Sequence, residues 1–417
     1  MTTFTLPSGL RVIIDNEASQ NVVYAGIAVA AGTRYEQPQE SGMAHFVEHM
    51  TFKGTPHLTS LQILNRMESV GGDLNAYTGK EEVVYYTIFP REHLQRALTL
   101  LTDIVFNSTF PQAEIEKERE VVIDEIESYN DSPAELIYDD FEALLYPDHP
   151  LGRRILGEAE ALRQYNTSNL QAFAHRLYTP SRAVLFIKGK VTEEEVRKMD
   201  SSLALPAKEG AITLDNSSLS SCLKHSAPFG RAGGESSPII IKKSTHQAHV
   251  MLGARAYAIN DPRYMGLALL SNLLGGPAMN SRLSLALRER TGLVYTVESS
   301  LSAYTDTSTW AIYFGCDHTD VRRCLRLVHR ELRRLIEHPL SSRILATAKR
   351  QLCGQMSIAT DNFESTALGM AKRYLLTGHV PTLEERCQRI NALQATDLQA
   401  IAQEIFSPDH LTTLIYE

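Results

Sequence analysis

An internal repeat is the feature that most constrains how this chain folds. Residues 170–182 read LQAFAHRLYTPSR, and residues 398–410 read LQAIAQEIFSPDH. Each stretch has the pattern of a short amphipathic helix that ends near a proline, and each runs into an apolar strand pattern, AVLFIKG or LTTLIY. The repeated helix–proline–strand unit predicts an internal duplication. Chance similarity is the weaker explanation, because the proline position also matches.

The chain between the two copies has a different composition. Residues 204–237 are rich in Ser, Gly, Ala and Pro and have no sustained hydrophobic period, which is typical of a linker. We therefore expect an N-terminal domain at 1–203 and a homologous C-terminal domain at 238–417. The length of 417 residues and the apolar fraction of 43% allow each half a core of its own.

Strand and helix patterns are mixed within each half. Expected strands lie at 21–31, 74–77 and 83–89, and later near 238–257 and 294–315. Expected helices lie at 41–53, 61–70, 91–106, 112–129 and 134–145, and later near 262–274 and 280–290. Thr59 and Gln62 have capping-box spacing before the second of these helices. Hairpins beside helix runs predict the α+β class: two tandem, similar domains, each a mainly antiparallel sheet packed with helices.

Charge, cysteine content and hydropathy argue against several classes of function. The net charge of −8 gives no sign of a nucleic-acid partner, which favours a basic face. Five cysteines without a CxxC pair argue against a disulfide framework and a thiolate zinc site. The N-terminus lacks the pattern of a signal peptide, and no apolar stretch is long enough to span a membrane. We expect a cytoplasmic protein.

The segment HFVEH at 45–49 has the spacing of a metal site. His45 and His49 lie four residues apart, so on a helix both imidazoles project from one face and can bind the same ion. Glu48 borders that face, where its carboxylate reaches a metal-bound water rather than the metal. The pattern H-x-x-E-H is the inverzincin signature.

A catalytic zinc needs a third protein ligand and an open position for water. The acidic segment EKEREVVIDEIE supplies candidates, because Glu118 and Glu125 are seven residues apart and share a helix face. The apolar residues Val121, Val122 and Ile126 are expected to hold this helix in the core. Spacing alone does not choose between the two acids, and it leaves four others open: Glu114, Glu116, Glu120 and Glu127.

Three segments together resemble the pitrilysin family of zinc peptidases, with the mitochondrial-processing-peptidase-like branch as the nearest. They are SGMAHFVEHMTFKGT, GGDLNAYTGKEEVVYY and EKEREVVIDEI. The resemblance implies that Glu125 is the third ligand beside His45 and His49. It also implies that Glu118 is a supporting acid near the site and that Glu48 is the general base.

The resemblance implies a zinc-dependent endopeptidase that hydrolyses peptides or unfolded segments. Zinc lowers the pKa of its bound water from about 16 toward about 7, and Glu48 takes the proton and passes it to the leaving amine. Four domains enclose a chamber in the family, and this chain supplies two. A homodimer is therefore the simpler expectation, and a heterodimer with a related subunit is the alternative.

Two further segments carry substrate-binding expectations from the family. Asn75, Ala76 and Tyr77 match an edge strand that pairs with the substrate backbone, although an ordinary hairpin strand has the same pattern. Arg288 and Tyr295 match a pair that contacts substrate near the metal and donates hydrogen bonds to a carbonyl or oxyanion. Without the resemblance, we would interpret Arg288 as a solvated arginine on a helix and Tyr295 as the first residue of a strand.

Two other classes of function remain as alternatives. One is a non-catalytic subunit of a larger assembly, and the other is a peptide-binding partner that needs a second chain for turnover. The complete set of His45, Glu48, His49 and Glu125 favours the enzyme over both.

Overall fold

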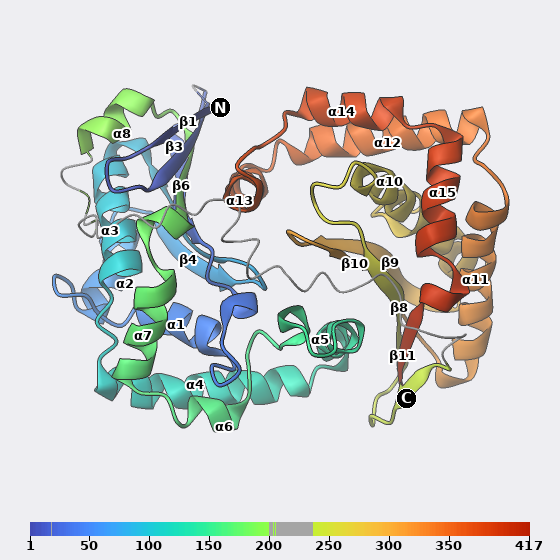
Figure 1. The fold of residues 1–417 in the computed structure, drawn as a ribbon, viewed down its shortest axis with the longest axis horizontal. Helices are drawn as coiled ribbons and strands as arrows, with labels where there is room; N and C mark the ends of the chain where they lie inside the picture. The colour runs from blue at the N-terminus through green and yellow to red at the C-terminus, as the bar shows by residue number, and fades with distance from the viewer. Residues whose placement is uncertain (18, 200–202, 204, 206–236) are drawn as a thin grey trace. The chain divides into compact units, whose positions relative to one another are not determined.

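The computed structural model describes residues 1–17, 19–199, 203, 205 and 237–417, which form two compact units, each built on one sheet (Figure 1). Unit 1 consists of the described residues of Met1–Ser128, His149–Cys222 and Thr360–Val380. Unit 2 consists of the described residues of Tyr129–Asp148, Leu223–Ala359 and Pro381–Glu417. Nearly all of the expected linker at 204–237 lies outside the described residues.

The sheet of unit 1 has six strands within the described residues. Neighbouring strands are antiparallel, except for the parallel pair β2 and β6. The strand β4, which carries the NAYT sequence, lies at one edge. The order across the sheet is β1 (Thr2–Thr5), β2 (Arg11–Asn16), β6 (Ala183–Gly189), β3 (Val22–Val29), β5 (Val83–Pro90) and β4 (Asp73–Thr78).

The sheet of unit 2 repeats five of these strands in the same order and directions. Its order in the described part of the chain is β7 (Ile239–Ile241), β11 (Thr412–Tyr416), β8 (Ala248–Ala256), β10 (Ser308–Cys316) and β9 (Val294–Ala303). The pair β7 and β11 is parallel, and the other pairs are antiparallel. Two mainly antiparallel sheets packed with helices confirm the predicted α+β class.

The helix–proline–strand repeat is present in both units. The helix α7 (Thr167–Leu177) leads through a short 3₁₀ turn at Pro180–Arg182 into β6. Likewise, α15 (Ala395–Ile405) leads through Pro408–His410 into β11. In each copy the proline stands at the first position of the turn, where its missing N–H costs no helical hydrogen bond.

The inner strands of the first sheet, β2, β6, β3 and β5, are buried on both faces because their side chains alternate between two apolar clusters. On β3, Ala25 and Ile27 belong to the main core, whereas Ala28 belongs to a smaller cluster. On β6, Leu185 and Phe186 are divided in the same way, as the period of two requires. The helices α1 (Met43–Thr51), α3 (Leu94–Asn107) and α7 contribute to the main core.

The two halves of the chain exchange one helix each. The helix α5 (Pro133–Leu145) follows α4 (Gln112–Asn130) and packs on β8 and β11 of unit 2. The helix α13 (Phe363–Thr377) packs on β3 and β6 of unit 1. Figure 1 shows this orange-red helix beside strands coloured blue and green. Each unit therefore completes its core with a segment from the other half. The expected domains, 1–203 and 238–417, follow from the sequence repeat. The two compact units differ from them by the exchanged segments Tyr129–Asp148 and Thr360–Val380.

The remaining helices follow the sequence pattern with small shifts at their ends. The capping box of Thr59 and Gln62 is present at the start of α2 (Ser60–Glu68), as predicted. The expected helix near 280–290 contains a π-helical stretch, η6 (Ser284–Glu289). None of the helices in the described part of the chain combines the length and apolar character needed to span a bilayer. The other α-helices are α6 (Ala159–Leu162), α8 (Glu193–Met199), α10 (Tyr264–Gly275), α11 (Val321–Glu337), α12 (Ser342–Ala359) and α14 (Leu383–Ala392).

Candidate metal centre

The helix α1, which carries the HFVEH segment, is fixed at its first turn by a buried acid. The Glu36 carboxylate accepts hydrogen bonds from the backbone N–H groups of Gly42 (3.3 Å) and Ala44 (2.9 Å). Burial raises the pKa of Glu36 to about 8, although these two hydrogen bonds act in the opposite direction. Gly42 has a φ of 76°, and a Cβ there would lie 2.5 Å from the Leu156 carbonyl oxygen. Only glycine fits this entry into the helix.

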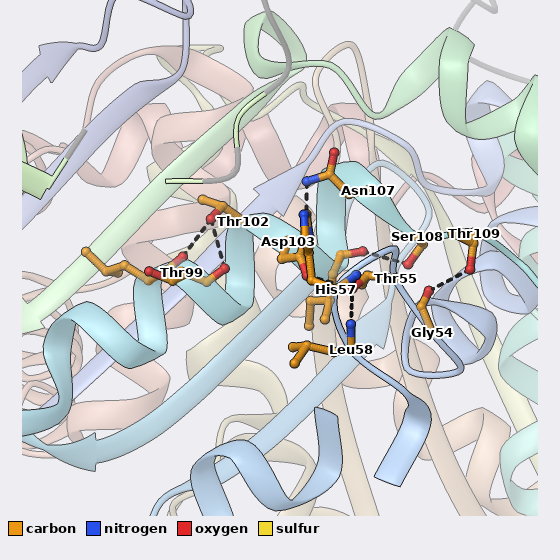
Figure 2. Close-up of polar contacts among 12 residues, drawn as sticks. Gly54, Thr55, His57, Leu58, Thr99, Thr102, Asp103, Asn107, Ser108 and Thr109 are labelled. Carbon is orange, nitrogen blue, oxygen red and sulfur yellow. Dashed lines mark hydrogen bonds and ion pairs between the residues drawn. The ribbon is translucent and has the colours of Figure 1, made fainter. Parts of the chain in front are cut away.

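The segment that follows α1 is fastened to the last turns of α3 (Figure 2). The buried Asp103 carboxylate accepts hydrogen bonds from Thr55 Oγ1 (2.6 Å) and His57 Nδ1 (2.9 Å). Ser108 Oγ donates to the carbonyl of Thr51, the last residue of α1, over 3.1 Å. Both ends of α1 are thus held by polar contacts, and its apolar side chains lie in the core between them.

Three potential ligand side chains converge beside α1. The imidazole rings of His45 and His49 lie 4.6 Å apart, centroid to centroid. Glu125 of α4 places its carboxylate oxygens 3.8 Å from His45 Nε2 and 3.5 Å from His49 Nε2. One ligand atom from each residue lies within 4.8 Å of the other two. Among the described residues, this is the one group of three His, Cys, Asp or Glu side chains that forms such a cluster.

The hydrogen bonding of His49 fits a cation in this cluster. Its Nδ1 lies 2.9 Å from Glu118 Oε1 and donates to that carboxylate, so in the neutral ring Nε2 has the lone pair. Nε2 lies 3.5 Å from Glu125 Oε2, an arrangement that is favourable when positive charge is present, as a proton on Nε2 or as a metal ion between the two atoms. Two imidazoles and one carboxylate are also the donor set of a catalytic zinc site with an open fourth position.

The surroundings of the two imidazoles differ. Burial lowers the pKa of His45 to about 3, so this ring is neutral and available as a ligand. Burial alone also lowers the pKa of His49, but its hydrogen bond to Glu118 and the charges of Glu48 and Glu125 outweigh that effect and raise it. Carboxylates therefore make the position of His49 favourable for positive charge. His45 Nδ1 has no hydrogen-bond partner among the described residues.

Lys53 completes a chain of contacts behind His49. Its Nζ lies 2.5 Å from Glu118 Oε2, while the other oxygen of that carboxylate contacts His49. Burial raises the pKa of Glu118, but the hydrogen bonds from His49 and Lys53 lower it by more. Glu118 therefore stays ionised and keeps the His49 ring in one orientation, as a partner behind a metal ligand does.

Glu48 is buried next to this cluster and is held by one hydrogen bond. The hydroxyl of Thr78, the last residue of β4, donates to Glu48 Oε2 over 2.5 Å. Burial raises the pKa of Glu48, and the nearby charge of Glu125 adds to the effect, against the hydrogen bond from Thr78 and the charge of His49. A carboxylate with a raised pKa suits a general base that works near neutral pH.

The expected substrate-binding residues lie on edge strands or close to one. Asn75, Ala76 and Tyr77 are in β4, at the edge of the first sheet. Tyr295 is in β9, at an edge of the second sheet, and its side chain is 84% exposed. The Arg288 guanidinium lies 5.6 Å from the centre of the Tyr295 ring, so this pair meets within unit 2. Their contact with substrate stays a prediction.

The structure adds three residues that the sequence analysis did not single out: Glu36, Lys53 and Thr78. Lys53 and Thr78 both lie in segments quoted in the sequence analysis. Lys53 follows His49 by four residues, so helical spacing alone could have predicted that the two side chains lie on the same face. One expectation about α4 was wrong. Val121 is 52% exposed, and the helix is held instead by its buried residues Ile115, Val122, Ile123 and Ile126.

Comparison with known families identifies the chain. Residues 11–159 match the family described as Insulinase (Peptidase family M16), and residues 165–352 match the family described as Peptidase M16 inactive domain. A Bacillus subtilis (strain 168) protein named "Uncharacterized zinc protease YmxG" is 31% identical over 413 residues, which cover 99% of this chain and 97% of that protein. The chain belongs to the M16 family of peptidases. The predicted pitrilysin-family membership is thereby confirmed.

A further relative agrees in sequence, and two solved structures agree in fold. An "Uncharacterized zinc protease" from Rickettsia bellii (strain RML369-C) is 32% identical over 411 residues, which cover 98% of this chain and 96% of that protein. The crystal structure of a protease from Helicobacter pylori matches with a TM-score of 0.88 at 21% identity, and covers 100% of this chain and 99% of that one. An "M16 inactive domain" structure from Pseudomonas fluorescens matches with a TM-score of 0.85 at 19% identity, covering 100% and 97%. At these identities the two structures bear on the fold alone.

Proposed function

We propose that this M16 protein is a zinc-dependent endopeptidase in which Glu48 is the general base. The observation that carries the proposal is the convergence of His45, His49 and Glu125 on one point, with Glu48 buried beside them. Two relatives that match nearly the whole chain are named zinc proteases, which supports the choice of metal.

Each residue has a role that follows from its surroundings. His45, His49 and Glu125 would hold the ion, and Glu118 with Lys53 keeps His49 oriented toward it. A zinc ion bound there supplies a lowered pKa for water and polarises the scissile carbonyl. Glu48 takes a proton from the attacking water and returns it to the leaving amine. Thr78 holds Glu48 in place for both transfers.

The edge strand β4 is the proposed docking site for the substrate backbone. An extended peptide added to this edge makes main-chain hydrogen bonds with Asn75, Ala76 and Tyr77, a mode that tolerates varied side chains. The same strand ends at Thr78, which contacts Glu48, so backbone pairing and proton transfer share one element. Arg288 and Tyr295, both exposed, are the proposed donors to a substrate carbonyl or to the oxyanion formed on attack.

We further propose that two chains form a homodimer whose chamber admits peptides or unfolded segments, as in the processing-peptidase-like branch. A heterodimer with a related subunit is the alternative. Light scattering during size-exclusion chromatography measures the mass of the active species. An active enzyme with the 46.5 kDa mass of one chain would contradict a shared chamber.

A quenched fluorescent peptide assay tests the enzyme assignment. We expect the purified chain to cleave unstructured peptides, to lose activity with a chelator and to regain it when zinc is added. Activity that ignores the chelator would contradict metal-dependent chemistry. No hydrolysis by a zinc-loaded dimer would favour the two alternatives, a non-catalytic subunit or a peptide-binding partner.

A further inference from the structure

A pocket in unit 2 has no part in the proposed peptidase chemistry. It has a volume of about 390 Å³ and lies where η6, the C-terminal end of α11 and the first turn of α12 meet. Pockets of this size hold small organic ligands. The lining residues are Arg282, Leu285, Arg290, Glu331, Arg334, His338, Pro339, Leu340, Ser341 and Ile344.

The lining of this pocket is basic in a chain whose net charge is −8. Three guanidinium groups face a single carboxylate, that of Glu331. This carboxylate is already engaged, because Arg334 Nη1 lies 2.8 Å from Glu331 Oε1. The three arginines and Glu331 together give the lining a net charge of +2, and the excess comes from Arg282 and Arg290.

The excess positive charge is only partly solvated. Arg282 is half-buried, and its guanidinium has no hydrogen bond or ion pair at contact distance among the described residues. Burial lowers the pKa of Arg282, against the more distant attraction of Glu331. Arg290, at the rim, is exposed and likewise lacks a side-chain hydrogen bond or ion pair within the described part of the chain. Both groups have free donors for an anion.

One wall of the pocket is apolar. Leu285, Leu340 and Ile344 contribute to the lining, and Ile344 is exposed although it is a large apolar residue. Ser341 and Ile344 bracket the start of α12, a helix of 18 residues whose first N–H groups add to the positive potential. The site therefore combines cationic donors with an apolar surface.

We propose that this pocket binds a small organic phosphate, with Arg282 and Arg290 on the phosphate and the apolar wall against the organic group. A doubly charged phosphate balances the net charge of the lining. Guanidinium groups also match the geometry of phosphate oxygens, with two parallel hydrogen bonds each. The inference does not depend on the metal centre, whose residues belong to unit 1.

Isothermal titration of the zinc-loaded, full-length protein at about 150 mM salt tests the proposal. The ligands are phenyl phosphate, inorganic phosphate and benzoate. We expect saturable binding of phenyl phosphate, weaker binding of inorganic phosphate because it lacks the apolar part, and still weaker binding of benzoate. Arg282→Gln and Arg290→Gln should each weaken phenyl phosphate about tenfold or more.

Arg322→Gln is the matched control, because Arg322 is exposed on α11, loses the same charge and does not line the pocket. We expect its affinity for phenyl phosphate to stay within about twofold of the unaltered protein, since screened surface charges contribute little. An equal loss in this control would mean a general surface effect and overturn the proposal. If Arg282→Gln fails to fold, the exposed Arg290→Gln decides the question alone.

Three other results would also overturn the proposal. Absence of saturable binding would mean that the pocket takes no phosphate. Binding that neither arginine variant weakens would place the phosphate elsewhere, including at the metal. Benzoate that binds as tightly as phenyl phosphate would replace the phosphate with a carboxylate, such as the C-terminus of a peptide.

Discussion

The two units of this protein share a strand order but differ in the helices that correspond to each other. Between its third and fourth strands, unit 1 has α1, with His45, Glu48 and His49. Between β8 and β9, unit 2 has α10, whose sequence YMGLALLSNLLG contains no histidine or acid. The acidic α4 likewise corresponds to α12, SRILATAKRQLCGQMSIA, which has no carboxylate.

The comparison shows that the fold does not require the metal cluster. In α10 the buried positions hold leucine, glycine and one serine, which pack without demanding a partner. In α1 the buried positions include His45 and Glu48, whose desolvation is unfavourable unless other groups compensate. The proposed function therefore depends on a few polar side chains of α1, whereas the corresponding helix α10 is buried without any histidine or acid.

The largest expected effect comes from removing the base while keeping the ligands. Glu48→Gln should lower the rate of peptide hydrolysis by about 10²–10⁴-fold, because a positioned acid–base group contributes that much. Zinc content, measured by atomic absorption, should stay at one ion per chain. The control is Ser271→Ala, a buried polar residue of the corresponding helix α10, which should keep activity. Zinc loss in Glu48→Gln would mean that the roles are misassigned.

Removing Glu125, the proposed ligand on α4, should weaken zinc binding by unit 1, since the corresponding helix α12 of unit 2 has no carboxylate. Glu125→Ala should lower zinc affinity by more than the about 10–100-fold expected for the outer partner in Glu118→Gln. Competition with a chromogenic chelator measures both values. Glu114→Ala is the control, since Glu114 lies on the same helix and pairs with Lys117 away from the cluster. Normal zinc affinity in Glu125→Ala would point to Glu118 as the ligand.

The exchanged helices predict reciprocal effects on stability. Met370→Ala in α13 should destabilise unit 1, and Phe141→Ala in α5 should destabilise unit 2, each by about 2–5 kcal/mol, the range for buried large-to-alanine changes. Hydrogen exchange should accelerate in β6 for the first variant and in β8 for the second. The opposite assignment, or equal acceleration in both sheets, would contradict the packing of these helices.

The smallest expected effect concerns Glu36, the buried acid at the start of α1. At the start of α10, Asp261 accepts a hydrogen bond from the backbone N–H of Arg263, but the Arg263 side chain lowers the pKa of Asp261. The pKa of Glu36 is raised from the ordinary 4.5 to about 8, so the folded state binds a proton that the unfolded state releases. Its contribution is therefore most favourable below pH 4.5 and declines as the pH rises to about 8. Glu36→Gln should raise the melting temperature at pH 9 by a few °C relative to the unaltered protein, and by less at pH 5. An equal change at both pH values would contradict the raised pKa.

Local features of the site followed from the sequence, because they depend on one helix. The four-residue spacing of His45 and His49 places both rings on one face in any α-helix. The capping box of Thr59 and Gln62 is equally local, and the structure contains it. The pairing of hairpin strands β4 and β5 also follows from the turn between them.

Features that depend on packing did not follow from the sequence alone. Spacing left Glu118 and Glu125 equivalent, and only the family resemblance chose between them, because the rotation of α4 against α1 is a tertiary property. The exposure of Val121 has the same origin. The hydroxyl of Thr78 reaches Glu48 across two elements, and no pattern within either element predicts that contact. The apolar faces of α5 and α13 likewise do not reveal which sheet they cover.

The helix exchange also orders events during synthesis. Strands β3 and β6 are synthesised before α13. The apolar side chains of Val184 and Phe186 therefore stay incompletely buried until α13, near the end of the chain, packs on them. A nascent chain that ends before α13 therefore already contains His45, Glu48, His49 and Glu125, but one face of its sheet is incompletely covered. Because unit 1 includes Thr360–Val380 and unit 2 includes Pro381–Glu417, neither unit can complete its packing before these late segments are synthesised.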